Sequence, residues 1–207
     1  MKENSILVII AAAGSGERFG GDIPKQYMQL NGKSVIENSV YPFLVSKYVK
    51  KLIIAISKND EFIEKQDFYN SKKVEFVLGG DSRQDSIKNA LDLDNKEFEF
   101  VITHDAARPN VSEADVTNLY KDILNTNVSC SFLYTPVYDS IKLVGENDIT
   151  KDKDKFFLVQ TPQICRQEDL RNALNKCIED ELNVLMNATP LSILIYLCQK
   201  SKEEDQI

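Results

Sequence analysis

Hydrophobic residues along the chain fall into short apolar runs that alternate with segments of helical spacing. The apolar runs cover residues 6–13, 51–57, 73–80, 99–106 and 129–137. The segments between them, where apolar residues recur at helical spacing, cover residues 34–46, 59–70, 82–93 and 112–125. Nearly continuous apolar strands separated by helices are typical of a parallel sheet that is covered on both faces. The pattern therefore predicts an α/β fold with a Rossmann-like, mostly parallel sheet and helices on both faces.

The length and composition fit one globular domain. The chain has 207 residues, of which 43% are hydrophobic and 28% are charged. This is enough for one well-buried core and too little for two of comparable size. We expect a single domain over residues 1–200, followed by a polar, disordered tail over residues 201–207.

Net charge, cysteines and the absence of targeting patterns narrow the class of protein. The formal net charge is −7, which argues against a nucleic-acid partner because phosphate backbones bind to basic faces. The four cysteines show no C-x-x-C pair, so we expect reduced thiols and no cysteine metal site. We find no leader pattern, and no apolar run reaches the roughly 18 residues of a membrane span. We therefore expect a cytoplasmic protein with no membrane partner.

Glycine-rich or polar segments follow three of the predicted strands. They are residues 14–18 after the first strand, residues 79–86 after the third and residues 104–109 after the fourth. Ligands of open α/β sheets bind beyond the carboxyl ends of the strands. Glycines let backbone amides approach phosphate oxygens closely, and Arg18 and Lys25 add positive charge next to the first segment. The sequence therefore predicts an anion site at this edge of the sheet.

Two familiar phosphate motifs do not fit the first glycine-rich segment. Residues 16–21 have the glycine spacing of a P-loop, but Asp22 and Ile23 follow where a Lys and a Ser or Thr are needed. Residues 14–20 miss the dinucleotide fingerprint G-x-G-x-x-G by one position. The next predicted strand also ends without an acidic residue to hold a ribose.

A third set of motifs fits well. In chain order these motifs read AAAGSGERFG and PKQY within residues 11–27, GGDSRQDS at 79–86, THDAARP at 103–109 and QTPQ at 160–163. Together they closely resemble the 2-C-methyl-D-erythritol 4-phosphate cytidylyltransferases of non-mevalonate isoprenoid biosynthesis, from about residue 6 to about residue 175. The resemblance implies a nucleotidyltransferase that moves CMP from CTP to this sugar-alcohol phosphate, releases pyrophosphate and uses Mg²⁺.

The ribitol-5-phosphate cytidylyltransferases of wall teichoic acid synthesis share this layout and are the alternative. That family tends to carry A-G-G in the first loop and H-D-A-V-R-P after the fourth strand. This chain has Ala12-Ala13-Gly14 in the loop and Ala106-Ala107-Arg108 after the strand. The resemblance therefore favours the erythritol phosphate as the acceptor.

The resemblance also implies a role for individual residues. Catalytic charge stabilisation is expected of Arg18 and Lys25. Nucleotide binding is expected of Ala12, Ala13, Gly14, Ser15, Gly16, Gly80, Asp81, Ser86 and Ala106. Acceptor binding is expected of Asp105, Ser140, Lys153 and Thr161. The resemblance names no full set of metal ligands, and Asp105 is the nearest candidate.

Residues 136–160 correspond to an arm that leaves the body in the family. Two such arms hook around each other in a homodimer, and each helps to close the site of the partner. Ser140 stands where the family has a threonine, and Lys153 stands where it usually has an arginine that grips the sugar phosphate. A lysine keeps the charge but loses the bidentate fork, so we expect weaker binding there rather than none.

Simpler structural interpretations accompany these roles. Arg18 and Lys25 could be surface cations, Asp105 a helix cap, and Arg108 a group that bonds carbonyls of its own loop. His104, the single histidine of the chain, fits a strand-end position better than a catalytic one. Arg83 fits a supporting role in an ion pair with Asp81 or Asp85.

The resemblance weakens after residue 175. Leu185 and Met186 stand where the family has a Thr-Asp pair, and no N-I-K-[IV]-T strand with its phosphate-binding lysine follows. Loss of one such cation would cost about 1.5–3 kcal/mol of acceptor binding. A weakly active, truncated homologue that still binds CTP is therefore the second hypothesis.

Overall fold

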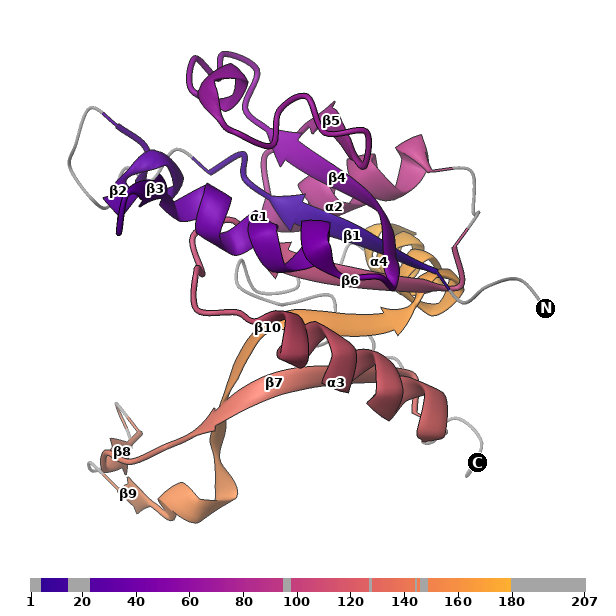
Figure 1. Cartoon of the computed structure of the whole chain (residues 1–207). Helices are drawn as coiled ribbons and strands as arrows, with labels where there is room; N and C mark the ends of the chain where they lie inside the picture. Colours follow the sequence, from indigo (N-terminus) through magenta and orange to yellow (C-terminus); the bar gives the residue numbers. More distant parts are fainter. Residues whose placement is uncertain are drawn as a thin grey trace.

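A single mixed sheet forms the centre of the molecule. The computed structural model describes residues 5–14, 23–94, 98–126, 128–143, 145 and 149–179. Six strands form the sheet in the order β5-β4-β1-β6-β10-β7 (Figure 1). Their bounds are β1 Ile6–Ala11, β4 Val49–Ile56, β5 Val74–Leu78, β6 Phe100–Asp105, β7 Cys130–Pro136 and β10 Phe157–Arg166. The first four pair in parallel, and β10 lies antiparallel between β6 and β7. The predicted mostly parallel α/β fold is confirmed.

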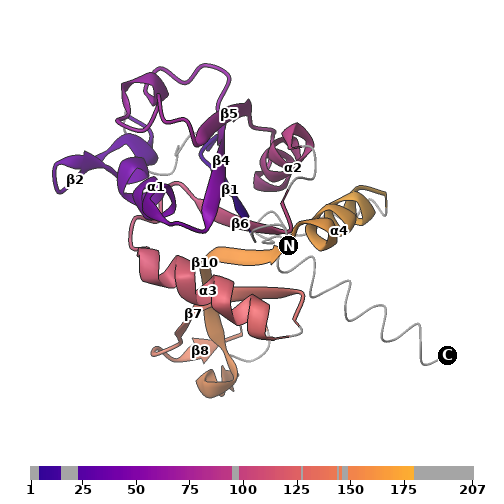
Figure 2. The same cartoon turned by 45° about the vertical axis from the view of Figure 1, so that its right-hand side comes forward.

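Helices cover both faces of this sheet. α1 (Val35–Val45) and α3 (Glu113–Asn125) lie on one face, and α2 (Arg83–Leu93) and α4 (Gln167–Glu179) lie on the other (Figure 2). In the part of the chain that the structure describes, no helix is both long and apolar enough to cross a membrane.

The alternation of side chains along β1 explains why its sequence is apolar throughout. Ile6, Val8 and Ile10 pack into the core beneath α1 and α3, whereas Leu7 and Ile9 pack beneath α2 and α4. All five side chains are fully buried. A strand with two covered faces has no solvent side on which polar residues could stand.

The segment after β4 is the clearest departure from the predicted elements. Residues 59–70 were expected to be helical, but the structure has only one short 3₁₀ turn there, Ile63–Lys65. The Asp60 carboxylate accepts hydrogen bonds from the backbone N–H groups of Phe62 and Ile63, and the Phe62 ring stacks on Tyr27. These contacts hold the segment in a compact loop, so the helix prediction is wrong here.

A small hairpin and a short turn lie between β1 and α1. The 3₁₀ turn Lys25–Tyr27 carries Lys25, and the hairpin consists of β2 (Gln29–Leu30) and β3 (Lys33–Ser34). The Ser34 side chain then opens α1 as a capping box with Glu37. The turn and the hairpin therefore connect the carboxyl end of β1 to the start of α1.

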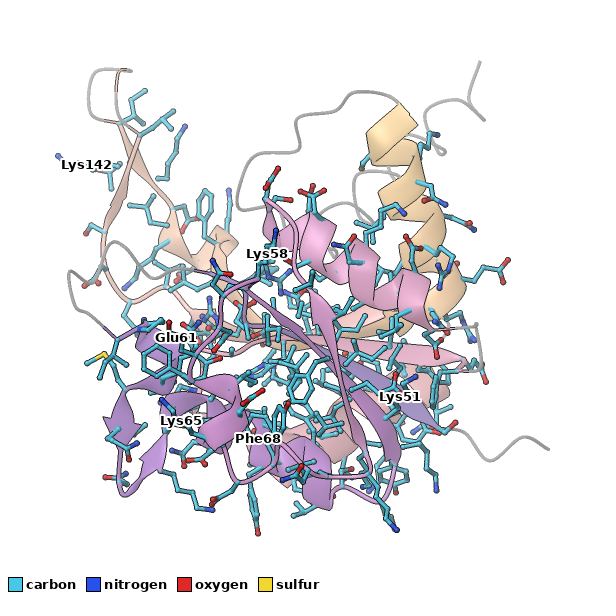
Figure 3. All side chains as sticks on the ribbon, turned by 90° about the horizontal axis from the view of Figure 1, so that it is seen from above. Lys51, Lys58, Glu61, Lys65, Phe68 and Lys142 are labelled. Atoms are coloured by element: carbon cyan, nitrogen blue, oxygen red, sulfur yellow. The ribbon has the colours of Figure 1, made fainter. Side chains whose placement is uncertain are left out.

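An arm projects from the body between β7 and β10. The two strands run past the edge of the helical layers, and β8 (Ile141–Lys142), β9 (Thr150–Lys151) and the turn Lys153–Lys155 lie beyond them (Figure 1). Lys142 stands well apart from the body when the molecule is seen from above (Figure 3). This projection lies where the arm was predicted, over residues 136–160. The predicted tail, residues 201–207, lies outside the described residues.

The start of α3 offers a direct test of helix capping. The Ser112 hydroxyl accepts from the backbone N–H of Asp115, and the Asp115 carboxylate accepts from the backbone N–H of Ser112. We expect Ser112→Ala to lower the free energy of unfolding by about 1 kcal/mol, measured by urea denaturation. Ser57→Ala, at an exposed loop position, is the control. Equal effects of the two substitutions would contradict the capping role.

Candidate active site

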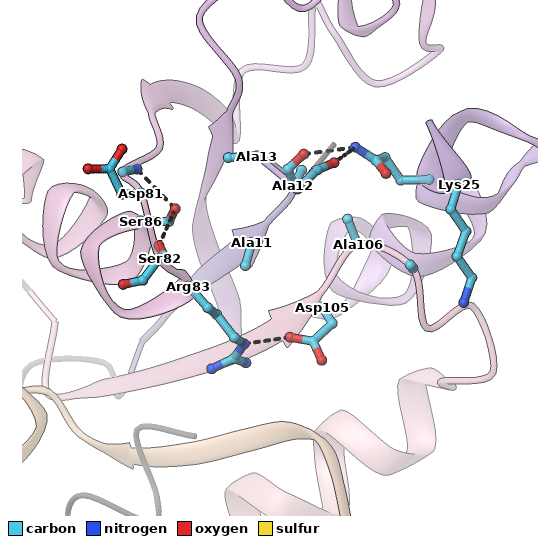
Figure 4. Close-up of a pocket in the computed structure, with 14 residues that line it drawn as sticks. Ala11, Ala12, Ala13, Lys25, Asp81, Ser82, Arg83, Ser86, Asp105 and Ala106 are labelled. Atoms are coloured by element: carbon cyan, nitrogen blue, oxygen red, sulfur yellow. Dashed lines mark hydrogen bonds and ion pairs between the residues drawn. The ribbon is translucent and has the colours of Figure 1, made fainter. Parts of the chain in front are cut away.

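A pocket of about 510 Å³ lies at the carboxyl ends of β1 and β6. It is lined by Ala11, Ala12, Ala13, Gly14, Lys25, Gln26, Gly80, Asp81, Ser82, Arg83, Ser86, Asp105, Ala106 and Ala107. Figure 4 shows the alanines that follow β1 between the turn of Asp81 and Ser86 on one side and Lys25 on the other. The predicted anion site and this pocket therefore occupy the same edge of the sheet.

Backbone pairing brings the small residues of the pocket together. Ala11 on β1 is in register with Asp105 on β6, and the backbone N–H of Ala106 donates to the carbonyl of Ala11. The N–H of Ala12 donates to the carbonyl of Ala55 on β4. Alanine at the ends of both central strands leaves the floor of the pocket free of large side chains.

The turn before α2 approaches this floor closely because it contains glycines. A Cβ atom at Gly79 would lie 2.3 Å from the Ala13 Cβ, and one at Gly80 would lie 2.3 Å from the Asp85 Cβ. The backbone N–H of Gly80 donates to the Ser86 hydroxyl at 3.1 Å, and that hydroxyl donates to the carbonyl of Ser82 at 3.0 Å. Ser86 therefore shapes the turn from a buried position.

The Asp105 carboxylate lies between two arginines. Its Oδ1 accepts from the Nε of Arg83 at 2.7 Å, and its Oδ2 accepts from the Nε of Arg108 at 3.0 Å. Burial alone would raise the pKa of Asp105, but the charge and hydrogen bond of Arg83, joined by those of Arg108, lower it below its usual value. Asp105 is therefore an ionised carboxylate at neutral pH.

Three simpler interpretations are wrong. Arg83 pairs with Asp105 rather than with Asp81 or Asp85, because the Asp85 carboxylate belongs to the capping box of α2. Asp105 caps no helix, because Ser112 supplies the cap of α3. The Arg108 side chain bonds the Asp105 carboxylate and the Gln160 side chain rather than loop carbonyls.

His104 and Thr161 form a buried link behind Asp105. The Arg108 carbonyl can only accept, so the His104 Nε2 at 3.1 Å must carry the proton. The Nδ1 atom then accepts from the Thr161 hydroxyl at 3.0 Å, and that hydroxyl accepts from the backbone N–H of Asp105 at 3.3 Å. Burial lowers the pKa of His104 to about 4. The histidine is therefore a neutral strand-end residue that ties β6 to β10.

The remaining predicted residues either lie away from this pocket or fall outside the described residues. Ser140 and Lys153 are exposed on the arm, where the Lys153 ammonium donates to the carbonyl of Tyr138 at 2.9 Å. Thr161 lies behind the pocket wall. Ser15, Gly16 and Arg18 lie outside the described residues, as do Leu185 and Met186. Within the described residues, one chain thus brings the other predicted nucleotide residues together but leaves the predicted acceptor residues of the arm outside the pocket.

The pocket contains few groups that could hold a metal ion. The described residues include no cluster of three or more His, Cys, Asp or Glu side chains. Asp105 and Asp81 are the carboxylates among the described residues that line the pocket. Each Asp105 oxygen accepts one of the arginine bonds above, and a carboxylate offers about four acceptor positions in total. This donor set fits Mg²⁺, which is typically bound by one or two carboxylates together with substrate phosphates.

Residues that line the pocket but received no predicted binding role are Ala11, Gln26, Ser82, Arg83 and Ala107. Gln26 belongs to the PKQY motif, and Arg83 belongs to GGDSRQDS. Their position within these motifs was therefore the signal in the sequence that could have assigned Gln26 and Arg83 to the site. What the sequence does not reveal is the partner of each side chain, because both partners are distant in the chain.

Comparisons with known proteins agree on one family. The family profile described as 2-C-methyl-D-erythritol 4-phosphate cytidylyltransferase (IspD) matches residues 6–192. The protein of that name from Wigglesworthia glossinidia brevipalpis is 37% identical over 171 residues, which cover 82% of this chain and 74% of the relative. The one from Haemophilus ducreyi is 33% identical over 193 residues, which cover 92% and 84%.

Solved structures give the same picture. The crystal structure of Francisella tularensis 2-C-methyl-D-erythritol 4-phosphate cytidylyltransferase is similar with a TM-score of 0.78 and 32% identity, and the match covers 93% of this chain and 86% of that one. The 4-diphosphocytidyl-2C-methyl-D-erythritol synthase of Anaerococcus prevotii has a TM-score of 0.80 at 23% identity, with coverage of 94% and 83%. The second similarity supports the fold alone.

The buried histidine predicts a pH-dependent stability. The pKa of His104 is about 4 in the folded protein and near 6.5 in an unfolded chain. Between these values the unfolded chain binds one more proton, so the stabilisation present above about pH 6.5 is lost as the pH falls toward 4. The loss amounts to about 3 kcal/mol. The lowered pKa of Asp105 places its titration below this range.

Urea denaturation of the parent and of His104→Gln between pH 4.5 and pH 7.5 checks this expectation. The stability advantage of the parent should shrink as the pH falls, because the variant has no imidazole to protonate. An advantage that stays constant over this range would contradict the expectation, because it would show that His104 has the same pKa in the folded and the unfolded chain.

Proposed function

The chain belongs to the 2-C-methyl-D-erythritol 4-phosphate cytidylyltransferase family, and we propose that it transfers CMP from CTP to 2-C-methyl-D-erythritol 4-phosphate. The observation that carries this proposal is the pocket at the carboxyl ends of β1 and β6. There Gly14, Lys25 and the turn before α2 meet around a floor of alanines. Such a site accommodates a nucleotide at the position where open α/β sheets bind their ligands.

The reaction requires positioning more than acid–base chemistry. A phosphate oxygen of the acceptor attacks the α-phosphorus of CTP, and the bond from that phosphorus to the bridging oxygen of the β-phosphate breaks. Pyrophosphate leaves with the electron pair of that bond. The attacking phosphate is already ionised at neutral pH, so no general base has to remove a proton. Catalysis then depends on bringing anions together and on stabilising the charge at the α-phosphorus.

We assign the triphosphate to the loop after β1. Lys25 supplies a positive charge from the rim of the pocket, and Arg18 supplies a second from the loop. The backbone amides of Ala13 and Gly14, which follow the last sheet hydrogen bond of β1, would offer donors to phosphate oxygens. Both cations would stabilise charge that develops at the α-phosphorus and on the departing pyrophosphate.

We assign the cytidine to the turn before α2. Gly80, Asp81 and Ser86 are its base-binding residues, and Ala106 borders the ribose. This assignment is supported by the close approach of the turn to Ala13, which glycine at position 79 permits.

Asp105 is the residue that would hold Mg²⁺ together with phosphate oxygens. The ion, when bound, neutralises negative charge on the triphosphate as the two anionic substrates meet. Arg83 keeps the carboxylate ionised and oriented, since its Nε bonds Oδ1 directly. Asp105 also borders the side from which the acceptor would enter.

We further propose that the active form is a homodimer joined through the arms. Large apolar side chains are exposed along the arm: Tyr134, Tyr138, Phe156, Phe157 and Leu158 are 46% to 75% exposed. Ser140 and Lys153 lie on the same arm and not in the pocket of their own chain. In a dimer they would reach the acceptor at the partner's site, and Thr161 would hold the base of the arm against Asp105.

Lys25→Ala should remove nearly all activity with CTP and 2-C-methyl-D-erythritol 4-phosphate. Loss of a cation from the reacting phosphates costs on the order of 10²–10³ in kcat. Pyrophosphate release measures the effect. Lys72→Ala is the matched control, because Lys72 is an exposed lysine that precedes β5 at the opposite edge of the sheet. Unchanged turnover in Lys25→Ala would remove Lys25 from the site.

Mixing two inactive variants tests the assembly. One chain carries Lys25→Ala in the pocket, and the other carries Ser140→Ala with Lys153→Ala on the arm. Random pairing makes half of the dimers mixed, and each mixed dimer has one intact site, so about a quarter of the parent activity should return. No recovery from a mixture shown to contain mixed dimers would mean that the arm does not serve the partner's site.

A further inference from the structure

One buried side chain joins the two parts of the pocket that the phosphates are expected to contact. Gln26 is 6% exposed, and its Nε2 donates to the carbonyl of Ala12 at 2.9 Å and to the carbonyl of Gly14 at 3.0 Å. Both amide hydrogens are therefore used on the loop after β1. Gln26 is also the residue next to Lys25 on its 3₁₀ turn.

These two hydrogen bonds change which backbone groups of the loop after β1 can interact with an anion. Carbonyl oxygens at the wall of a phosphate site repel phosphate oxygens unless a donor occupies them. The Gln26 amide occupies two such oxygens at once and does so without a charge of its own. Each peptide unit is planar and trans, so holding the Ala12 carbonyl toward Gln26 also directs the N–H of Ala13 away from it.

We propose that Gln26 is a positioning residue for the triphosphate of CTP, which fixes the loop after β1 relative to Lys25 and masks two of its carbonyls. This inference rests on the proposed function, because it takes the same pocket as the CTP site. Gln26 itself does not contact the reacting atoms. Its effect reaches them through the backbone of residues 12–14 and through the placement of Lys25.

A role in fold stability alone makes a different prediction. Loss of two buried hydrogen bonds destabilises a protein wherever they lie. It does not by itself weaken the binding of CTP more than the binding of the acceptor. If Gln26 positions the triphosphate, its loss should raise KM for CTP and leave KM for the acceptor unchanged. The separation of the two KM values therefore distinguishes the two roles.

The first test uses Gln26→Met, which keeps the length of the side chain and removes both donors. We expect KM for CTP to rise about tenfold or more, with KM for 2-C-methyl-D-erythritol 4-phosphate unchanged. Gln66→Met is the matched control. Gln66 also makes two hydrogen bonds, to the Ser34 hydroxyl and to the Phe62 carbonyl, but it does not line the pocket. Its substitution should lower the melting temperature without changing KM for CTP.

The second test uses Gln26→Glu, which keeps the shape of the side chain. An ionised Glu would oppose the carbonyls of Ala12 and Gly14, whereas a protonated Glu restores one donor. Repulsion and burial both raise the pKa of such a carboxyl group. The ratio of KM for CTP in the variant to that in the parent should therefore fall as the pH is lowered from 8 to 6.

The parent and the Met variant serve as references for this pH series. The described charged groups that line the pocket are Lys25, Asp81, Arg83 and Asp105. These groups and Arg18 are the same in all three proteins, so their contributions are compared directly in the ratios. The ratio for Gln26→Met should stay flat with pH. Equal KM values for CTP in Gln26→Met and the parent would overturn the proposal, and so would a pH-independent ratio for Gln26→Glu.

The role of Gln26 can still be tested if the proposed acceptor is wrong. CTP binding can be followed without turnover, through the rise in melting temperature that CTP causes. Absence of turnover in the parent would count against the proposed function, whereas a CTP-induced rise that is smaller in Gln26→Met than in Gln66→Met would still support the inference. Equal rises in these two variants would overturn it.

Discussion

The ion pair between Arg83 and Asp105 is the contact on which the polar side of the pocket depends. It joins the first turn of α2 to the end of β6, and Arg108 extends it to the Gln160 side chain at the base of the arm. Partial burial raises the pKa of this carboxyl group, and the paired positive charge of the arginines outweighs that effect and lowers it. The two arginines provide this charge from opposite sides. The same carboxylate can then face a metal ion and two anionic substrates without a change of protonation.

The rest of the pocket is built from backbone and small side chains. Ala11, Ala12 and Ala106 form its floor, and the glycines before α2 form a wall that tolerates no added Cβ atom. Rigid strand ends hold these groups, so little has to be ordered when a nucleotide binds. Among the described residues, Ser140 and Lys153 lie on the arm and outside this pocket. Under the proposed dimer, they would complete the site of a second chain.

Much of this organisation is visible in the sequence, for physical reasons. Strands covered on both faces must be apolar throughout, and this is why β1 and β4 are readable as continuous runs. Glycine-rich segments at strand ends can likewise be recognised in the sequence, because few other residues let the backbone approach a neighbouring group so closely. Pocket residues such as Gly80, Lys25 and Asp105 were therefore within reach of sequence reasoning.

Other features depend on contacts that no local pattern records. The helix expected over residues 59–70 is replaced by a loop because Asp60 and Phe62 find partners in and beyond that segment. Strand β10 was not anticipated as a member of the sheet, since half of it belongs to the arm. The partner of Arg83 lies 22 positions away in the chain, and charge alone favoured the nearer Asp81 and Asp85.

Product analysis with the purified chain, CTP and Mg²⁺ tests the proposed reaction most directly. 2-C-methyl-D-erythritol 4-phosphate and ribitol 5-phosphate are supplied in separate reactions, and the nucleotide products are identified by mass. We expect a CMP adduct of the erythritol phosphate together with an equal amount of pyrophosphate, and no adduct of ribitol phosphate. An adduct of ribitol phosphate alone, or CTP binding without any adduct, would contradict the proposed reaction.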